Sequence, residues 1–311
     1  MRVVVSDLLY VRMRAPDLAE AERFLVAFGM VVSVRTDGAI YMRGTDASPH
    51  ILIAELGDPG IIAIGLSVSS ADLEIASKLA GASGIETLSE PGGGSRVRLR
   101  DPMGYTVELV HGQELQDPIP VDPIRINDAV EKFRRIGTPR RIEKGPARVK
   151  NISHVVMTTL DVRGVGEWYA NTLGLLTSDQ IYREYPSNIV GAFYRLNKGD
   201  TYVDHHMLNI VKGPKVGFNH IAFEVADIDD IMKGHEHLKA GGYRHMRGPG
   251  RHFLGSQIFD YWLDPWGRMM EHLTDTDMLN CHARPGEFAA GTTDSPWGSS
   301  SSPEFRDQVS R

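Results

Sequence analysis

Residues 247–271 read RGPGRHFLGSQIFDYWLDPWGRMME and contain a turn that the chain uses twice. They predict a loop past His252, a strand through IFDYW, a β-turn at DPWG with proline at its second position, and a strand that ends at Glu271. Apolar residues surround this glutamate, and a buried carboxylate is costly unless it pairs with a cation or binds a metal. We therefore expect Glu271 to have a cationic partner.

Two histidines in other strand-like segments are candidate partners. His154 lies in NISHVVMTTLD and His220 lies in GFNHIAFEVAD. Two imidazoles and one carboxylate from three neighbouring strands form a facial triad, which leaves half of an octahedral metal open for non-haem Fe(II) oxygen chemistry. Each histidine alone is more simply a hydrogen-bonded core residue, but the combination favours a metal site. The predicted metal ligands are His154, His220 and Glu271.

The same module occurs in both halves of the chain. Residues 8–30 and 152–175 each read as a strand, an Asp-containing turn and an amphipathic helix that ends at glycine. Further along each half, a DPxG turn precedes a glutamate, which is Glu108 in the first half and Glu271 in the second. Matched landmarks in the same order indicate an internal duplication.

The duplication places the metal in the second half. At the positions equivalent to the three ligands, the first half carries Tyr10, Gly65 and Glu108. Each half reads as a strand, a helix and then several strands, without the regular crossover helices of a doubly wound sheet, so an α+β fold is expected. A curved antiparallel sheet with a helix on one side would offer its concave face to a ligand.

Composition shifts give the expected domain boundaries. We expect an N-terminal domain without metal over residues 1–112, a linker over 113–149, a catalytic domain over 150–283 and a flexible tail over 284–311. The linker is rich in proline and alternating charges, and the tail contains GTTDSPWGSSSSPEF.

Composition also narrows the class of function. The chain has 311 residues, of which 41% are hydrophobic, and a net charge of -6, which gives no basic face for nucleic acid. Its apolar runs are shorter than the ~20 residues that a membrane helix requires. Cys281 is the only cysteine, so intramolecular disulfides and zinc-thiolate clusters are excluded. With no apparent export signal, we expect a cytoplasmic protein that acts on a small molecule.

These motifs resemble those of the type I extradiol ring-cleavage dioxygenases, the catechol 2,3-dioxygenase kind, in the vicinal oxygen chelate superfamily. The resemblance covers both halves and is most specific over residues 151–271, where SHVV, NHIAFEV and RGPGRH...Y...DPWG...E occur in family order. One departure is Asp260, because the family pattern prefers an aliphatic residue before Tyr261.

The resemblance implies a fold and a reaction. The expected fold is two tandem vicinal oxygen chelate domains built from paired βαβββ modules, with the metal in the C-terminal domain. The expected activity is extradiol (meta) cleavage of a catecholic substrate with incorporation of both atoms of O2, in the degradation of aromatic compounds. The implied cofactor is Fe(II), with Mn(II) as a second possibility, and the implied assembly is a homo-oligomer.

The resemblance also assigns two residues to the substrate. His252 and Tyr261 have the spacing of the family histidine and tyrosine that hydrogen-bond the substrate hydroxyl oxygens. Arg247 is a candidate for binding an acidic ring substituent, with surface charge as the simpler interpretation.

Two adjacent histidines compete for the role of acid and base during O2 activation. Strand alternation sends His205 and His206 to opposite faces, and Leu208 and Ile210 would take His206 toward the core. The resemblance to the first of such a pair also favours His205, so we expect His205 in the catalytic set. His206 stays open as the alternative and as a candidate substrate contact.

Two other functions share the same scaffold. A glyoxalase-like enzyme would use the divalent metal for other chemistry, and His205, His252 and Tyr261 argue against it. A metal-free small-molecule-binding protein of the bleomycin-resistance type is disfavoured by the intact triad.

Overall fold

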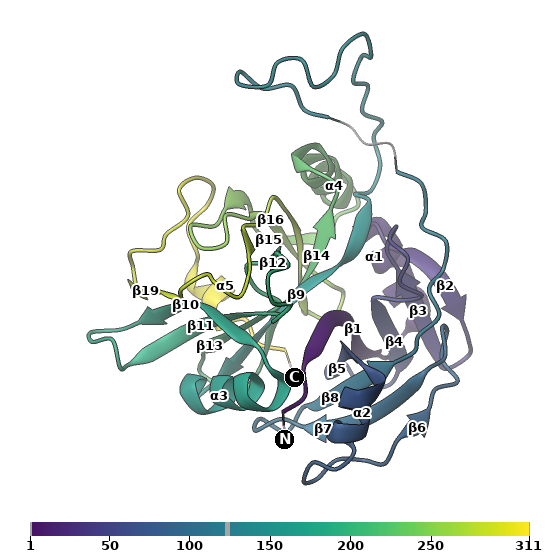
Figure 1. Cartoon of the computed structure of the whole chain (residues 1–311). Coiled ribbons are helices and arrows are strands. Elements are labelled where there is room, and N and C mark those ends of the chain that lie inside the picture. The colour runs from purple at the N-terminus through teal and green to yellow at the C-terminus, as the bar shows by residue number, and fades with distance from the viewer. Residues whose placement is uncertain (1, 122–124, 311) are drawn as a thin grey trace.

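The computed structural model describes residues 2–121 and 125–310, which form two large sheets side by side (Figure 1). The first sheet has eight strands in the order β2-β3-β4-β1-β5-β8-β7-β6. The second has nine in the order β15-β16-β17-β14-β9-β13-β11-β10-β19, and β12 pairs with β18 separately. None of the helices found within these residues is long and apolar enough to cross a membrane.

The first half contributes ten elements. In chain order they are β1 (Val5–Ala15), α1 (Leu18–Phe28), β2 (Val31–Arg35), β3 (Ala39–Arg43), β4 (Leu52–Leu56), β5 (Gly60–Val68), α2 (Ser70–Ala76), β6 (Glu86–Thr87), β7 (Ser95–Arg100) and β8 (Thr106–His111).

The second half contributes the remaining described elements. They are β9 (Val149–Thr159), α3 (Val162–Leu173), β10 (Leu176–Tyr182), β11 (Ile189–Arg195), β12 (Val203–Asp204), β13 (Leu208–Lys212), β14 (Gly217–Val225), α4 (Ile228–Ala240), β15 (Arg244–Arg251), β16 (Ile258–Leu263), β17 (Met269–Thr274), β18 (Met278–Leu279), β19 (Gly286–Ala289) and α5 (Pro303–Asp307).

The strand, turn and helix unit is built in the same way in both halves. The side chain of Asp17 accepts a hydrogen bond from the Glu20 amide at 2.9 Å and caps α1. The side chain of Asp161 caps α3 by accepting from the Gly164 amide at 2.9 Å. Both helices end at a glycine with positive φ, a left-handed conformation that most other residues avoid.

Strand pairing confirms the duplicated α+β fold. β1 pairs antiparallel with β5 and parallel with β4, and β9 pairs antiparallel with β14 and parallel with β13. In each half the second strand of the DPxG hairpin then joins the sheet in parallel, as β8 beside β5 and β17 beside β14. The two halves are therefore tandem copies of one domain, while the exact residue boundaries stay predictions.

One apolar core joins the halves. Phe28 at the end of α1 stacks on the imidazole of His272 at 3.8 Å between ring centroids and packs edge-on against Phe223. His272 Nε2 also donates a hydrogen bond to the Phe28 carbonyl oxygen at 2.7 Å. The first half thus supports the back of the sheet that carries Glu271.

The last segment differs from the expected flexible tail over residues 284–311. β19 adds to the large sheet beside β10, and α5 buries Phe305. Ser310 then forms a β-bridge to Phe218 next to the second ligand strand. The serine- and glycine-rich composition concealed these contacts, because one aromatic side chain and a few backbone hydrogen bonds leave no periodic pattern in the sequence.

Candidate metal centre

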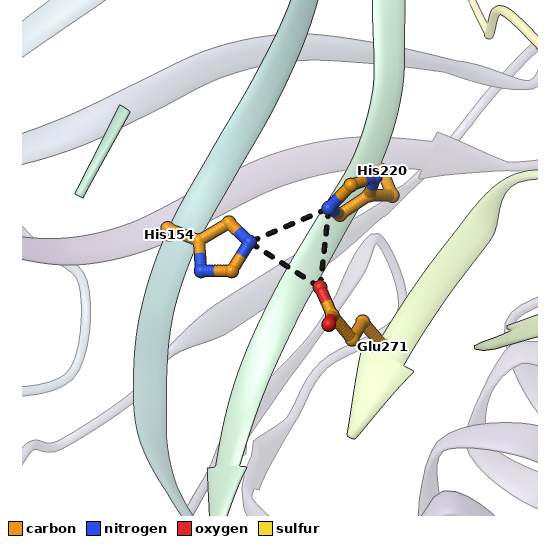
Figure 2. A group of neighbouring side chains, drawn as sticks. All are labelled: His154, His220 and Glu271. Atoms are coloured by element: carbon orange, nitrogen blue, oxygen red, sulfur yellow. Dashed lines mark hydrogen bonds and ion pairs between the residues drawn. The ribbon is translucent and has the colours of Figure 1, made fainter. Parts of the chain in front are cut away.

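The three predicted ligands come from adjacent strands of the second sheet and point to one face (Figure 2). His154 on β9 and Glu271 on β17 lie opposite Ala222 of β14 from either side. His220 lies two residues before Ala222, so alternation along β14 puts its side chain on the same face. The strand register therefore brings the ligands together without any loop.

The geometry fits a divalent ion. Nε2 of His154 lies 3.3 Å from Nε2 of His220, and Oε2 of Glu271 lies 3.3 Å and 3.1 Å from those two atoms. Adjacent ligands of an octahedral ion with bonds of roughly 2.1 Å are separated by roughly 3 Å, which matches this triangle. Within the described part of the chain, both buried oxygens of Glu271 lack a hydrogen-bond partner, as expected for atoms that bind a metal.

Protonation at the site favours metal binding. Burial alone raises the pKa of Glu271, but the imidazoles of His154, His220 and His252, 3.1–3.6 Å from the carboxylate, outweigh burial and hold the pKa well below its usual range. Burial also lowers the pKa of His154, which keeps that imidazole neutral. A carboxylate and a neutral imidazole are the forms that ligate a metal.

Asn219 orients one ligand and was missed from the sequence. Its Oδ1 accepts a hydrogen bond from His220 Nδ1 at 2.7 Å, which leaves the Nε2 lone pair for a metal. Its Nδ2 donates to the Gln308 carbonyl oxygen at 2.8 Å, so the last segment helps to fix the ligand. The only sequence signal was an asparagine immediately before the histidine, which has no specificity of its own.

The structure brings His252 and Tyr261 together beside the triad. His252 Nε2 lies 2.8 Å from the Tyr261 hydroxyl and 3.6 Å from Oε1 of Glu271. Burial raises the pKa of Tyr261 well above its ordinary value, so its phenol stays protonated. Burial also lowers the pKa of His252. The pair therefore offers a hydroxyl donor and a neutral imidazole next to the metal ligands.

The two adjacent histidines are placed differently from the expectation. The ring of His206 lies 4.3 Å from the ring of His154, whereas His205 Nε2 points away and donates to Asp179 at 2.8 Å. The chain leaves β12 at Asp204 and enters β13 only at Leu208, so strand alternation cannot be extended back across this pair. His206, rather than His205, is the histidine against the triad.

Arg247 is buried rather than displayed on the surface. Its guanidinium lies over Phe259 at 4.5 Å and over Phe305 at 5.1 Å, measured to the ring centroids. Its nitrogens donate to the Ser299 carbonyl oxygen at 3.0 Å and to Ser295 Oγ at 2.7 Å. Both serines belong to the last segment, which therefore packs beside the candidate site.

At the equivalent positions in the first half, the carboxylate is paired with other side chains. The Tyr10 hydroxyl donates to Glu108 at 2.8 Å, and the Tyr10 ring occupies the space that a Cβ at Gly65 would need. Nitrogens of Arg12 and Arg96 lie 3.3 Å and 3.1 Å from the same carboxylate. With Arg98 Nε at 3.5 Å as well, three guanidinium groups neutralise Glu108, so the buried triad that can hold a metal belongs to the second half.

Comparison with known proteins agrees with the fold and with the metal-ligand set described above. Residues 151–272 match the model of the Glyoxalase/Bleomycin resistance protein/Dioxygenase superfamily. Metapyrocatechase 2 of Cupriavidus necator is 32% identical over 301 residues, which is 96% of this chain and 90% of that protein. The similarity is therefore not confined to the ligand strands.

Solved structures share the fold at lower identity. A substrate complex of homoprotocatechuate 2,3-dioxygenase from Brevibacterium fuscum, with 3,4-dihydroxyphenylacetate, superposes with a TM-score of 0.81 at 19% identity, covering 100% of this chain and 94% of that one. The Mn(II)-bound glyoxalase from Novosphingobium aromaticivorans gives a TM-score of 0.79 at 22% identity, covering 97% and 94%. At these sequence identities the two superpositions show a shared fold and nothing about function.

Proposed function

The chain belongs to the Glyoxalase/Bleomycin resistance protein/Dioxygenase superfamily as an extradiol catechol dioxygenase, and we propose that a divalent metal held by His154, His220 and Glu271 carries its activity. The observation that supports this site best is the pair of buried Glu271 oxygens without hydrogen-bond partners in the described chain, facing two imidazole nitrogens. We propose Fe(II) as the ion, although imidazole and carboxylate also suit Mn(II).

The metal ion provides chemistry that protein side chains cannot provide. When bound, it would supply Lewis-acid and electron-transfer chemistry between a catecholate and O2. The protein's own contribution is to orient the ring, to exclude water and to place protons.

Tyr261 and His252 are suited to the first proton transfer. The phenol stays protonated at neutral pH because burial raises its pKa, so it donates a hydrogen bond to a substrate oxygen. Burial lowers the pKa of His252, and the neutral imidazole can accept the proton that a catechol hydroxyl loses on binding. Their 2.8 Å hydrogen bond lets the two groups act as one network.

His206 is suited to the later proton transfers. In the tautomer of His205 that donates from Nε2 to the Asp179 carboxylate at 2.8 Å, Nδ1 is the acceptor nitrogen. His206 Nδ1, 3.0 Å away, then donates to that atom and keeps the Nε2 lone pair of His206 free to take up a proton. We assign His206 as the acid and base and His205 as the residue that positions it, which reverses the expectation from strand alternation.

A glyoxalase reaction on the same scaffold is the rival for this metal site. The neutral imidazoles and the phenol gathered around the triad favour a reaction that moves several protons, as ring cleavage does. A metal-free binding role would leave the Glu271 carboxylate buried without a counter-charge. The homo-oligomeric assembly and the cytoplasmic location stay predictions.

Oxygen consumption separates these functions. The iron-loaded protein is mixed with a panel of monocyclic, fused and biaryl catechols in an oxygen electrode, and absorbance of the ring-opened product is followed in parallel. A dioxygenase consumes O2 as the coloured product appears. A glyoxalase or a binding protein leaves the O2 concentration unchanged, and that result would overturn the proposal.

A further inference from the structure

A second cluster of two histidines and a carboxylate lies on the other face of the catalytic sheet. His235 is on α4, His245 is on β15, and Asp260 is on β16 immediately before Tyr261. Alternation along β16 turns Asp260 away from the triad, toward the face that α4 covers. The ligand-type atoms of the three residues lie within 4.8 Å of one another.

Asp260 is buried and held in one orientation. Its side chain is 0% exposed, and Trp262 Nε1 donates to its Oδ2 at 2.6 Å. Among the described residues, its ion-pair partners are His235 Nδ1 at 3.1 Å and His245 Nε2 at 2.8 Å. A carboxylate at this depth requires positive charge, and here the neighbouring groups are imidazoles rather than lysine or arginine.

We propose that His235, His245 and Asp260 bind a second divalent metal ion, zinc, independently of the catalytic ion. The oxygen-to-nitrogen distances of 2.8–3.2 Å resemble those of the catalytic triangle, and imidazole with carboxylate is a common ligand set for tetrahedral zinc. The His245 side chain is 32% exposed, so water can fill the fourth position. The Trp262 N–H would act as the outer hydrogen bond that orients the ligating carboxylate.

A zinc ion bound by these three residues would cross-link α4 to the hairpin of β15 and β16. This hairpin carries Arg247 and Tyr261 to the catalytic side, so the second ion would support the site from behind. It also explains the departure at Asp260 from the family's preference for an aliphatic residue. An aliphatic side chain there would leave His235 and His245 without a shared carboxylate.

The competing explanation is that protonated imidazoles alone neutralise Asp260. The hydrogen bond to Asp260 raises the pKa of His235, with Glu236 adding to the increase and Lys239 opposing it. This arrangement needs no metal and would show no specific zinc uptake, so metal stoichiometry distinguishes the two.

The test is the metal content of each purified variant after loading with iron and zinc and removal of free ions. We expect one iron and one zinc per chain in the wild type, and loss of zinc alone in Asp260→Leu and His245→Ala. Glu271→Ala should show the reverse, with zinc kept and iron lost. The control is His282→Ala, because Asp200, Cys281 and His282 form another, exposed group of possible ligands.

Two results would overturn the proposal. One is unchanged zinc content in both Asp260→Leu and His245→Ala, and the other is loss of zinc in His282→Ala. Because the buried Asp260 variant risks misfolding, His245→Gln provides a second measurement at a partly exposed position. Added zinc should raise the unfolding midpoint of iron-loaded wild type but not of His245→Gln, and an equal rise in both would contradict the site. Oxygen uptake on the same samples reports the catalytic function separately.

Discussion

Tyr261 lies directly opposite Glu271 in the antiparallel pair of β16 and β17. Directly opposed residues send their side chains to the same face of a sheet, so the phenol is carried to the carboxylate by the strand register. The DPxG turn that joins the strands fixes this register. The hairpin therefore supplies both a metal ligand and a hydrogen-bond donor for the substrate.

Metal occupancy should depend on the second half alone. His154→Ala, His220→Ala and Glu271→Ala each remove one of three ligands, and we expect each variant to lose stable iron binding. Glu108→Ala is the matched control, because Glu108 is already paired with arginine side chains. Metal analysis after dialysis measures iron occupancy in each variant. If Glu271→Ala kept iron and Glu108→Ala lost it, the assignment of the metal site to the second half would be wrong.

The two adjacent histidines should differ in their effect on turnover. His206→Phe should keep the metal but lose most of its turnover, because the ring beside His154 is the proposed acid and base. His205→Phe should be milder, since His205 acts through its hydrogen bond to His206. Asp179→Asn weakens the hydrogen bond between Asp179 and His205, and this variant should shift the pH profile of kcat. Steady-state oxygen uptake on metal-matched protein measures all three, and a larger loss in His205→Phe would restore the role to His205.

Removal of the Tyr261 hydroxyl should slow turnover more than it weakens substrate binding. Its hydrogen bond to a substrate oxygen strengthens as charge redistributes, and one such bond contributes about 1.5–3 kcal/mol, or roughly ten- to a hundredfold in rate. Tyr261→Phe should therefore lower kcat with a smaller change in KM. Tyr10→Phe, which removes a phenol from the first half, is the control. Unchanged kcat in Tyr261→Phe would remove this residue from the catalytic set.

Much of this site could be predicted from the sequence because it rests on strands. His154, His220 and Glu271 lie in regular elements whose alternation and register follow from short-range patterns. The duplication also showed which half lacks ligands, since Tyr10 and Gly65 replace the histidines. Local sequence patterns were therefore sufficient to predict the metal site and the fold class.

The remaining features depend on contacts that local patterns do not encode. The choice between His205 and His206 is decided by an irregular stretch between β12 and β13, where no period applies. The position of Phe305 against Tyr261, at 4.8 Å between ring centroids, joins residues 44 positions apart in a low-complexity segment (305 - 261 = 44). Such long-range packing is fixed by the tertiary structure.

Asp204 should make the stability of the fold depend on pH. Burial raises its pKa to about 6, and Glu224 adds to this shift. Because the folded-state pKa exceeds the ordinary aspartate value of 3.8, the stabilising contribution is present below that value and is lost as pH rises through about 6. Asp204→Asn should therefore raise the free energy of unfolding at pH 7.5, on the order of 1–2 kcal/mol, and have less effect at pH 5.

Urea unfolding at the two pH values checks the Asp204 prediction. Asp58→Asn is the control, because Asp58 is an exposed carboxylate in the turn between β4 and β5 and should give the same small effect at both. An Asp204→Asn effect that is equal at pH 5 and pH 7.5 would mean that this carboxylate titrates alike in the folded and unfolded chain.

Extradiol cleavage at the triad transfers both atoms of O2 to the product, so the fate of labelled oxygen reports directly on this reaction. Iron-loaded protein is given a catechol under ¹⁸O₂, and the product is trapped at once and analysed by mass spectrometry beside Glu271→Ala and Glu108→Ala. We predict a ring-opened product with both labelled oxygen atoms from the wild type and from Glu108→Ala, and none from Glu271→Ala. An intact ring, or a labelled product from Glu271→Ala, would contradict the account.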